Sequence, residues 1–359
     1  MIKVNTPMLY IKAHLFKSTL SAVRLAEENK SPENVCFAKR LLEVKNRPDN
    51  LKLNKSVSYN NMVMKCSAKY ADLLSRANAC FPALPRKDYV TDNDVVTQYD
   101  KINKLAQSFQ YINVPNIQRY EDIGTAACSQ IRTSNGTAMP ANKIAINGRE
   151  IAMRCQYPQA NYMAEHCRML LEQKPAVVVV LSSSEDIAAK KLPMYFCEDK
   201  NYDGIQVTTR TRVKSKTRMK KNTRLGDLIL NHHQMTIDDG QKAKTLSVIH
   251  VTNWPDRTTI NVNELNKLTH YVKSKISEKC AENSHLSAKP LIHCNAGVGR
   301  TGTLIGAMAL ADNTNQRSVE DIVLDMRKTG SDKMVQTLGQ YQTLCDFNEM
   351  LRTPKRAET

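Results

Sequence analysis

Several features that mark other protein classes are scarce or missing in this chain. Its ten cysteines include no CxxC pair and follow no repeated spacing, which argues against both a zinc site and a disulfide framework. The longest apolar run, residues 176–181, is far too short for a membrane span, so no stable membrane insertion is expected. Lys3 and Lys12 interrupt the apolar residues near the start, and no signal peptide of the Sec type is predicted. With 359 residues, 41% of them hydrophobic and only 6% aromatic, the chain can form one large globular domain and a smaller one.

Acidic residues are too few to balance the basic ones, and the formal net charge is +17. Part of the excess lies between residues 210 and 224, where basic side chains alternate at a period of two, as in a strand or hairpin with one basic face. Such a face can attract nucleic acid, anionic lipid or an acidic substrate, or it can be a solvated edge strand that resists aggregation. No aromatic residue interleaves for base stacking, so no nucleic-acid partner is expected, and an edge strand or a substrate-steering role is favoured. The basic residues are Arg210, Arg212, Lys214, Lys216, Arg218, Lys220, Lys221 and Arg224.

The chain is predicted to divide into a helical region, residues 1–85, and a larger domain, residues 88–353. Apolar residues recur at helical spacing over 11–45 and again over 62–79, and residues 81–87, with two prolines, form the predicted linker. In the larger part, strand-like and helix-like patterns mix, which predicts an α/β (α+β) fold. The predicted strands are 145–155, 176–181, 205–213 and 246–251, and the predicted helices are 95–109, 161–173, 263–279 and 318–328.

The segment from His293 to Thr301 carries the strongest chemical signal. It reads His-Cys-Asn-Ala-Gly-Val-Gly-Arg-Thr, after a short apolar strand and before an apolar helix. A strand, a tight glycine turn and a helix start direct several backbone N–H groups at one concave point, where they can bind an oxyanion. The positive helix end and Arg300 favour the thiolate of Cys294, and Arg300 can grip two phosphate oxygens. A buried structural cysteine before a glycine-containing helix start is the less favoured interpretation.

This segment resembles the signature loop of the protein tyrosine phosphatases, and other segments agree with it in order. Residues 254–256, Trp-Pro-Asp, resemble the mobile general-acid loop of that family. Residues 334–341 resemble its glutamine loop, and residues 118–123 resemble the loop that recognises the phosphotyrosine ring. The resemblance covers roughly residues 90–350 and implies a twisted mixed sheet flanked by helices. Within the family, it is greatest to the YopH-type phosphatases that pathogenic bacteria secrete, on the segments 154–158, 182–188, 306–308 and 318–321.

The resemblance implies a role for each residue of the signature loop. Cys294 would attack phosphorus, and His293 would orient and tune the thiolate, although a satisfied core histidine is a compatible reading. Arg300 and the backbone amides of the loop would bind the three equatorial oxygens of the phosphoryl group. Thr301 would donate its hydroxyl to the sulfur as it leaves. The residues that contribute the loop amides are Asn295, Ala296, Gly297, Val298 and Gly299.

The general acid is expected to be Asp256, which would protonate the departing phenolate and later activate water. Its alternative interpretation is an ordinary surface turn beneath Trp254. Arg257 follows the aspartate, and a glycine that is frequent nearby in relatives is missing. The sequence therefore does not determine how fast the loop moves. Gln336 is expected to hold the attacking water and Gln340 to support it, although either glutamine taken alone is more often an ordinary exposed residue.

Three further residues are assigned with a competing interpretation each. Glu185 can pair with Arg300 and fix its orientation, or it can simply be an acidic residue at a helix N-terminus, where the dipole favours it. Tyr120 would stack on the substrate ring and set the depth of the pocket. Asp122 would accept hydrogen bonds from the substrate backbone. For this pair the alternative is an ordinary surface turn.

The leading hypothesis is therefore a metal-independent protein tyrosine phosphatase without a cofactor, acting as a bacterial effector on host phosphotyrosine proteins. A type III secretion signal leaves no Sec-type mark, and a thiolate cysteine favours a reducing cytosol as the place of action. The region 1–85 can bind a secretion chaperone or a host target, or pack on the catalytic domain. The alternatives are a dual-specificity or phosphoinositide phosphatase with the same Cys-x5-Arg chemistry, and a phosphotyrosine-binding module with little activity. A nucleic-acid binder is the least favoured.

Overall fold

The computed structural model describes residues 92–211, 223–312 and 317–353. The predicted helical region 1–85, the predicted linker 81–87 and most of the basic stretch 210–224 lie outside the described residues. Two ends of that stretch are described: Arg210 in strand β8 (Ile205–Thr211) and Arg224 in strand β9 (Thr223–Leu225). Both strands pair antiparallel with β10 (Leu228–Asp238).

A mixed sheet carries the fold, and within the described ranges it has ten strands. Its three central pairings, β5–β12, β12–β6 and β6–β11, are parallel, and the outer pairings are antiparallel. The prediction of a twisted mixed sheet flanked by helices is confirmed. In spatial order the strands are β3 (Gln130–Arg132), β4 (Ala138–Ile146), β5 (Arg149–Cys155), β12 (Leu291–His293), β6 (Val177–Val180), β11 (Ala243–Val251), β10, β8 and β7 (Lys200–Tyr202), with β9 beside β10; β1 (Tyr111–Ile112) and β2 (Thr125–Ala126) pair separately.

Strand β6 shows why the central sequence is apolar without alternation. It consists of four fully buried valines. Successive side chains point to opposite faces of a sheet, so Val177 and Val179 enter one core while Val178 and Val180 enter the other. Each such side chain stabilises the fold by roughly 1.5–3 kcal/mol on burial. Helices therefore cover both faces, as expected for parallel strands.

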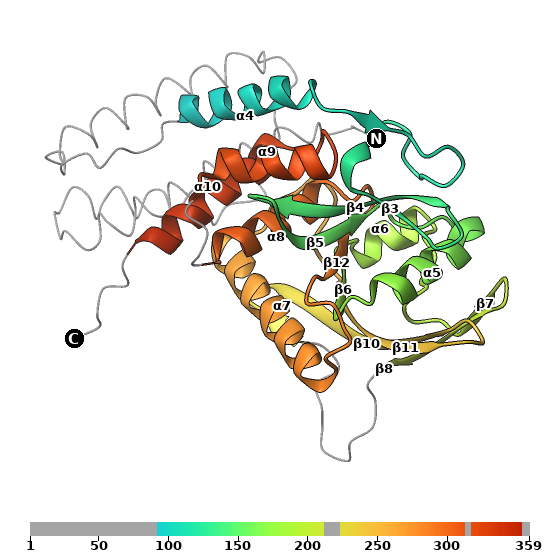
Figure 1. Cartoon of the computed structure of the whole chain (residues 1–359). Helices are drawn as coiled ribbons and strands as arrows, with labels where there is room; N and C mark the ends of the chain where they lie inside the picture. Colours follow the sequence, from blue (N-terminus) through green and yellow to red (C-terminus); the bar gives the residue numbers. More distant parts are fainter. Residues whose placement is uncertain (1–91, 212–222, 313–316, 354–359) are drawn as a thin grey trace, which may run out of the picture. The chain divides into compact units, whose positions relative to one another are not determined.

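The helices divide unequally between the two cores. Helix α5 (Met163–Gln173) packs into the core that contains Val178, and helices α7, α8, α9 and α10 pack into the core that contains Val177. Figure 1 shows α8 and α5 on opposite sides of β12. The remaining bounds are α4 (Asp92–Ala106), α6 (Ser184–Ala189), α7 (Val262–Glu282), α8 (Gly299–Leu310), α9 (Val319–Thr329) and α10 (Leu338–Arg352). None of these described helices is long and apolar enough to cross a membrane.

The predicted strand 145–155 is wrong in one respect, because it contains a hairpin turn. Strand β4 ends at Ile146, and β5 begins at Arg149. Between them, Asn147 and Gly148 both have positive φ, at 51° and 74°. Asn-Gly between apolar strands is a strong hairpin signal, because both residues adopt left-handed backbone angles easily. The predicted helices at 161–173, 263–279 and 318–328 are found within three residues of their predicted ends.

Candidate active site

The signature loop connects β12 to α8 and lies at the carboxyl end of the parallel strands. Gly297 has a φ of +71°, and a Cβ at this position would lie 2.0 Å from the carbonyl oxygen of Cys155, so only glycine fits. Helix α8 begins at Gly299 without a side-chain cap on its first turn. The amides at this helix end are therefore open to an anion, as the sequence predicts for an oxyanion-binding loop.

Arg300 is fully buried beside the loop and binds two other segments. Its Nη1 donates to the carbonyl oxygens of Leu181 and Trp254, at 3.0 and 2.7 Å. The same nitrogen lies 2.6 Å from Oδ2 of Asp186, on α6. Its Nη2 donates to Oδ1 of Asp256 at 2.9 Å. These contacts orient the guanidinium, and its Nε is buried without a hydrogen-bond partner in the described part of the chain.

The expectation that Glu185 pairs with Arg300 is wrong, because Asp186 takes that position. Asp186 is the N3 residue of a capping box on α6, in which Ser183 is the N-cap. In a helix this short, a shift of one residue turns a side chain by about 100°. Glu185 is exposed in the first turn of α6, in agreement with its alternative interpretation as an acidic residue near the positive helix end.

Asp256 lies against the signature loop rather than in an isolated surface turn. Besides Arg300, it is bound by Nζ of Lys190 at 2.8 Å and by Nδ2 of Asn295 at 3.1 Å. Partial burial by itself would raise the pKa of this carboxyl group, but the hydrogen bond from Lys190 and the charge of Arg300 outweigh burial, and the pKa is lowered. The preceding Trp254 is fully buried and donates from its indole nitrogen to the carbonyl oxygen of Thr258.

The thiol of Cys294 is buried, yet its pKa is lowered rather than raised. Burial alone would raise its pKa, but the Arg300 guanidinium and a hydrogen bond from the backbone of Thr301 lower it below its ordinary value. Thr301 is fully buried in the first turn of α8. The thiol therefore has the Arg300 cation beside it, while the hydroxyl of Thr301 has no hydrogen-bond partner in the described part of the chain. The seven cysteines of the described ranges are all free.

His293 points to the opposite face of the sheet from Cys294. Its Nδ1 lies 3.1 Å from the carbonyl oxygen of Cys294, and its Nε2 lies 2.7 Å from the hydroxyl of Tyr195. Burial lowers its pKa to about 4, so the imidazole is neutral at neutral pH. Both sequence interpretations fit. His293 is a core histidine with a hydrogen-bond partner at each ring nitrogen, and one of these partners is the backbone carbonyl of Cys294.

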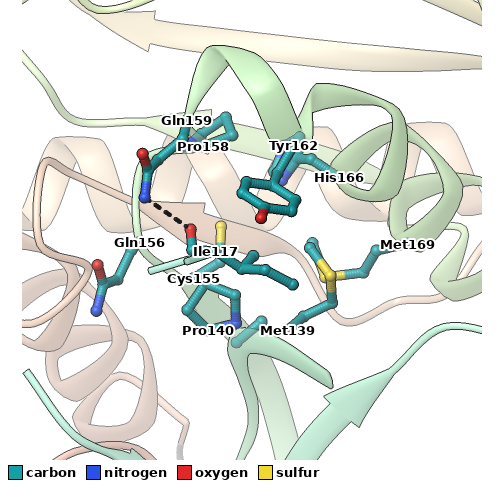
Figure 2. A pocket seen from close by; sticks show the side chains of 11 residues that line it. Ile117, Met139, Pro140, Cys155, Gln156, Pro158, Gln159, Tyr162, His166 and Met169 are labelled. Carbon is teal, nitrogen blue, oxygen red and sulfur yellow. Dashed lines mark hydrogen bonds between the residues drawn. The ribbon is translucent and has the colours of Figure 1, made fainter. Parts of the chain in front are cut away.

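The Tyr120 loop is anchored to the residues that follow β5. Oε1 of Gln156 accepts hydrogen bonds from the backbone N–H of Arg119 and of Tyr120, at 2.9 and 2.8 Å. Nε2 of Gln159 donates to the backbone carbonyl of Ile117, as Figure 2 shows. The cavity drawn there is only about 10 Å³, enough for one water molecule at most, so it is packing behind the loop rather than a ligand pocket.

Tyr120 and Asp122 differ in how firmly they are held. Tyr120 is half-buried and packs against the core cluster that contains Cys294 and Val298 of the signature loop, and burial is the main cause that raises its pKa. Asp122 is largely exposed, and its Oδ2 accepts a hydrogen bond from Lys333 at 2.8 Å. That bond lowers the pKa of Asp122.

The two predicted glutamines contribute in different ways. Gln340 is buried at the N3 position of α10, where its Oε1 accepts from the backbone N–H of Gln336 at 3.0 Å and its Nε2 donates to the carbonyl of Thr258 at 3.3 Å. It therefore ties the glutamine loop to the acid loop. A Cβ on Gly299 would lie 3.3 Å from Oε1 of Gln336, which places that side chain against the signature loop.

The protein-family model described as protein-tyrosine phosphatase matches residues 115–348 of this chain. The chain belongs to the protein-tyrosine phosphatase family. It is 36% identical over 250 residues to the tyrosine-protein phosphatase YopH of Yersinia enterocolitica, a match that covers 65% of this chain and 50% of that protein. It is also 29% identical over 262 residues to the secreted effector protein SptP of Salmonella paratyphi A, covering 70% of this chain and 46% of that protein.

The chain spans about half the length of these curated relatives. Among solved structures, a PTPN18 complex with HER2 phosphopeptides has a TM-score of 0.59 at 16% identity, covering 79% of this chain and 98% of that one. A second PTPN18 structure, titled for its recognition of HER2 tyrosine phosphorylation sites, has a TM-score of 0.57 at 16% identity and covers 72% of this chain and 94% of that one. At this identity the likeness shows the fold, and it confirms the predicted phosphatase architecture.

Two members of this phosphatase site were not found by sequence reasoning. Lys190 follows α6 and forms an ion pair with Asp256 at 2.8 Å, although 66 residues separate them. Asp186 is the second, because the sequence analysis assigns its role to the neighbouring Glu185. The spacing Ser183-x-x-Asp186 was an available signal for Asp186, because an acidic residue three positions after a serine indicates a capping box. A lone lysine such as Lys190 carries no such signal.

Proposed function

We propose that this protein hydrolyses phosphotyrosine in proteins through a cysteinyl-phosphate intermediate. The observation that carries the proposal is the meeting of three groups at the carboxyl end of β12: the thiol of Cys294, the guanidinium of Arg300 and the carboxylate of Asp256. These supply a nucleophile, an anion clamp and a proton donor within one buried loop system. Such a set performs phosphoryl transfer without needing a metal ion.

In the first step the Cys294 thiolate attacks phosphorus, and the bond from phosphorus to the tyrosine oxygen breaks. Asp256, as the carboxylic acid, gives its proton to that oxygen. In the second step water attacks phosphorus, Asp256 as the carboxylate takes the proton, and the sulfur leaves with a hydrogen bond from Thr301. Gln336 lies against the loop, where it can orient the water.

Arg300 and the loop amides, from Asn295 to Gly299, bind the phosphoryl oxygens. Nε of Arg300 has no partner among the described residues, and Nη2 is occupied by the Asp256 carboxylate. A phosphate dianion carries more charge than that carboxylate and can replace it at Nη2, with a second oxygen at Nε. The bidentate grip then frees Asp256 to face the leaving group.

A phosphotyrosine substrate is favoured over a phosphoinositide by the Tyr120 loop. Tyr120 is held beside the signature loop by Gln156 and is half-buried there, where its ring can stack on the ring of the substrate. Asp122 then lies at the outer edge of this loop and can accept from the peptide backbone, exchanging its bond with Lys333. A lipid head group brings no aromatic ring to stack.

We further propose that the protein acts as a secreted bacterial effector on host phosphotyrosine proteins. Two observations support this: the similarity to SptP, which is named a secreted effector protein, and the 36% identity over 250 residues to YopH, which is named a tyrosine-protein phosphatase. Delivery by a type III system, action in the reducing host cytosol and a secretion chaperone for the region 1–85 belong to the same proposal. The lowered pKa of Cys294 suits a reducing compartment, since thiolates oxidise readily.

The proposal is tested with the purified full chain on phosphotyrosine peptides, phosphoserine peptides and phosphoinositide vesicles, each with and without a chelator. We expect turnover of phosphotyrosine only, unchanged by the chelator. Cys294→Ser should lose at least about 10⁴-fold in kcat because the hydroxyl is a poor nucleophile, yet it should still bind phosphotyrosine peptide. Preferred turnover of the vesicles, or normal turnover by the serine variant, would refute the proposal.

A further inference from the structure

The side chain of Asn295 connects the signature loop directly to the acid loop. It follows Cys294 in the sequence, and only 1% of its surface is exposed. Its Nδ2 donates to Oδ2 of Asp256 at 3.1 Å, across 39 residues of sequence. The first residue after the nucleophile therefore touches the group that must deliver the proton.

This contact differs in kind from the other side-chain contacts of Asp256. Lys190 at 2.8 Å and Arg300 at 2.9 Å are both cations, and they stabilise the carboxylate but not the carboxylic acid. Asn295 is neutral and carries a donor at one end of its amide and an acceptor at the other. Its Oδ1 is buried and has no hydrogen-bond partner in the described part of the chain.

An amide can therefore hold Asp256 in both of the protonation states that the reaction requires. The ionised carboxylate accepts from Nδ2, as in the structure. A half-turn of the amide group presents Oδ1 to the protonated carboxyl, so that the buried oxygen gains a donor while Nδ2 moves to the place that Oδ1 leaves. Substrate phosphate, by contrast, draws Arg300 away from the carboxyl, and Lys190 favours only its charged form.

We propose that Asn295 is a positioning residue that keeps Asp256 aligned with the leaving group in both steps; this role rests on the proposed phosphatase activity. A positioning role through Asp256 has a signature that a merely structural role lacks. The need for a general acid grows with the basicity of the leaving group. Loss of the Asn295 side chain should therefore lower kcat more for substrates with poor leaving groups than for substrates with good ones.

The test compares wild type, Asn295→Ala, Asp256→Ala and the double variant on phenyl phosphate and on 2,4-dinitrophenyl phosphate. We expect Asn295→Ala to lower kcat about tenfold on phenyl phosphate, as for one lost hydrogen bond to a charged group, and by less than about twofold on the dinitrophenyl ester. In the Asp256→Ala background the further loss should be below about twofold, since the role acts through Asp256. Equal losses on both esters, or losses that multiply in the double variant, would overturn the proposal.

Two further variants separate hydrogen bonding from packing. Asn295→Asp keeps the shape but removes the donor, and it should lose at least as much on phenyl phosphate as the alanine variant; full retention would overturn the proposal. Asn142→Ala is the matched control, because Asn142 is as deeply buried but donates to Ala126 and Ser129. It should unfold at a lower temperature with unchanged dependence on the leaving group. A wild type inactive on both esters would refute the proposed function itself, whereas equal or multiplying losses in an active enzyme refute only the role of Asn295.

Discussion

Two regions of this molecule each contain a buried arginine, and they use it differently. In the signature loop, Arg300 faces two carboxylates, and its Nε has no partner among the described residues. On α9, Arg327 donates from all three nitrogens, to Met334, Asn103 and Val335, and lies over the ring of Tyr99. The unpaired Nε of Arg300 lies at the signature loop, where it can donate to a ligand, whereas each nitrogen of Arg327 donates to the protein itself and holds the fold.

The pKa directions of the two guanidinium groups show the same contrast. Burial lowers the pKa of Arg327, and nearby tyrosine hydroxyls offset this only in part. Burial also acts to lower the pKa of Arg300, but Cys294 and Asp256 outweigh it, and the pKa is raised. Arg300 therefore lies beside two groups, Cys294 and Asp256, whose ionised forms are negatively charged. In the proposed mechanism a phosphate dianion takes the place of the Asp256 carboxylate at this guanidinium.

The largest expected effect compares Arg300→Met with Arg327→Met. The first should lower kcat/KM by about 10³–10⁵-fold, because the charge of the transferred phosphoryl group loses its clamp. The second should stay within about tenfold in kcat/KM but lower the free energy of unfolding by about 2–4 kcal/mol, since buried carbonyls lose their donors. Steady-state kinetics and urea titration of both variants check this. A reversed pattern, with Arg300→Met the less stable and the more active, would erase the distinction.

A smaller effect tests which acidic residue orients Arg300. Asp186→Asn should lower kcat/KM by about tenfold, because the charge-assisted bond to Nη1 becomes a neutral one. Glu185→Gln, one residue earlier on the exposed side of α6, should change kcat/KM by less than about twofold. Equal effects of the two substitutions would mean that the charge of α6 as a whole, rather than one contact, acts on the site.

The smallest effect concerns the pH profile and Lys190. Lys190 helps to lower the pKa of Asp256, and Asp256 must be protonated to act as the acid, so activity falls as pH rises through that pKa. Lys190→Met removes the cation, the pKa of Asp256 rises, and the descending limb of kcat/KM against pH should move to higher pH. Lys191→Met, on the exposed neighbour, is the control. A limb that stays in place would show that the ion pair does not persist in solution.

Local sequence determined much of the fold and the core of the site. The loop from Cys294 to Arg300 needs its residues at fixed spacing, because the turn requires Gly297 and the helix start supplies the amides; such a motif is readable without a structure. The four valines of β6 and the capped helices α7 and α9 are equally local, since periodicity and capping act within a few residues.

Only the tertiary structure decided the contacts between segments that are distant in the sequence. Asp186 rather than Glu185 meets Arg300, 114 residues away, because helix phase and loop path fix the direction of a side chain together. Lys190 and Asn295 reach Asp256 from two other segments, and no spacing rule connects them. Local interactions determine where an element begins and whether it is a helix or a strand. The distance between two side chains that are far apart in the sequence is fixed only when the whole chain folds.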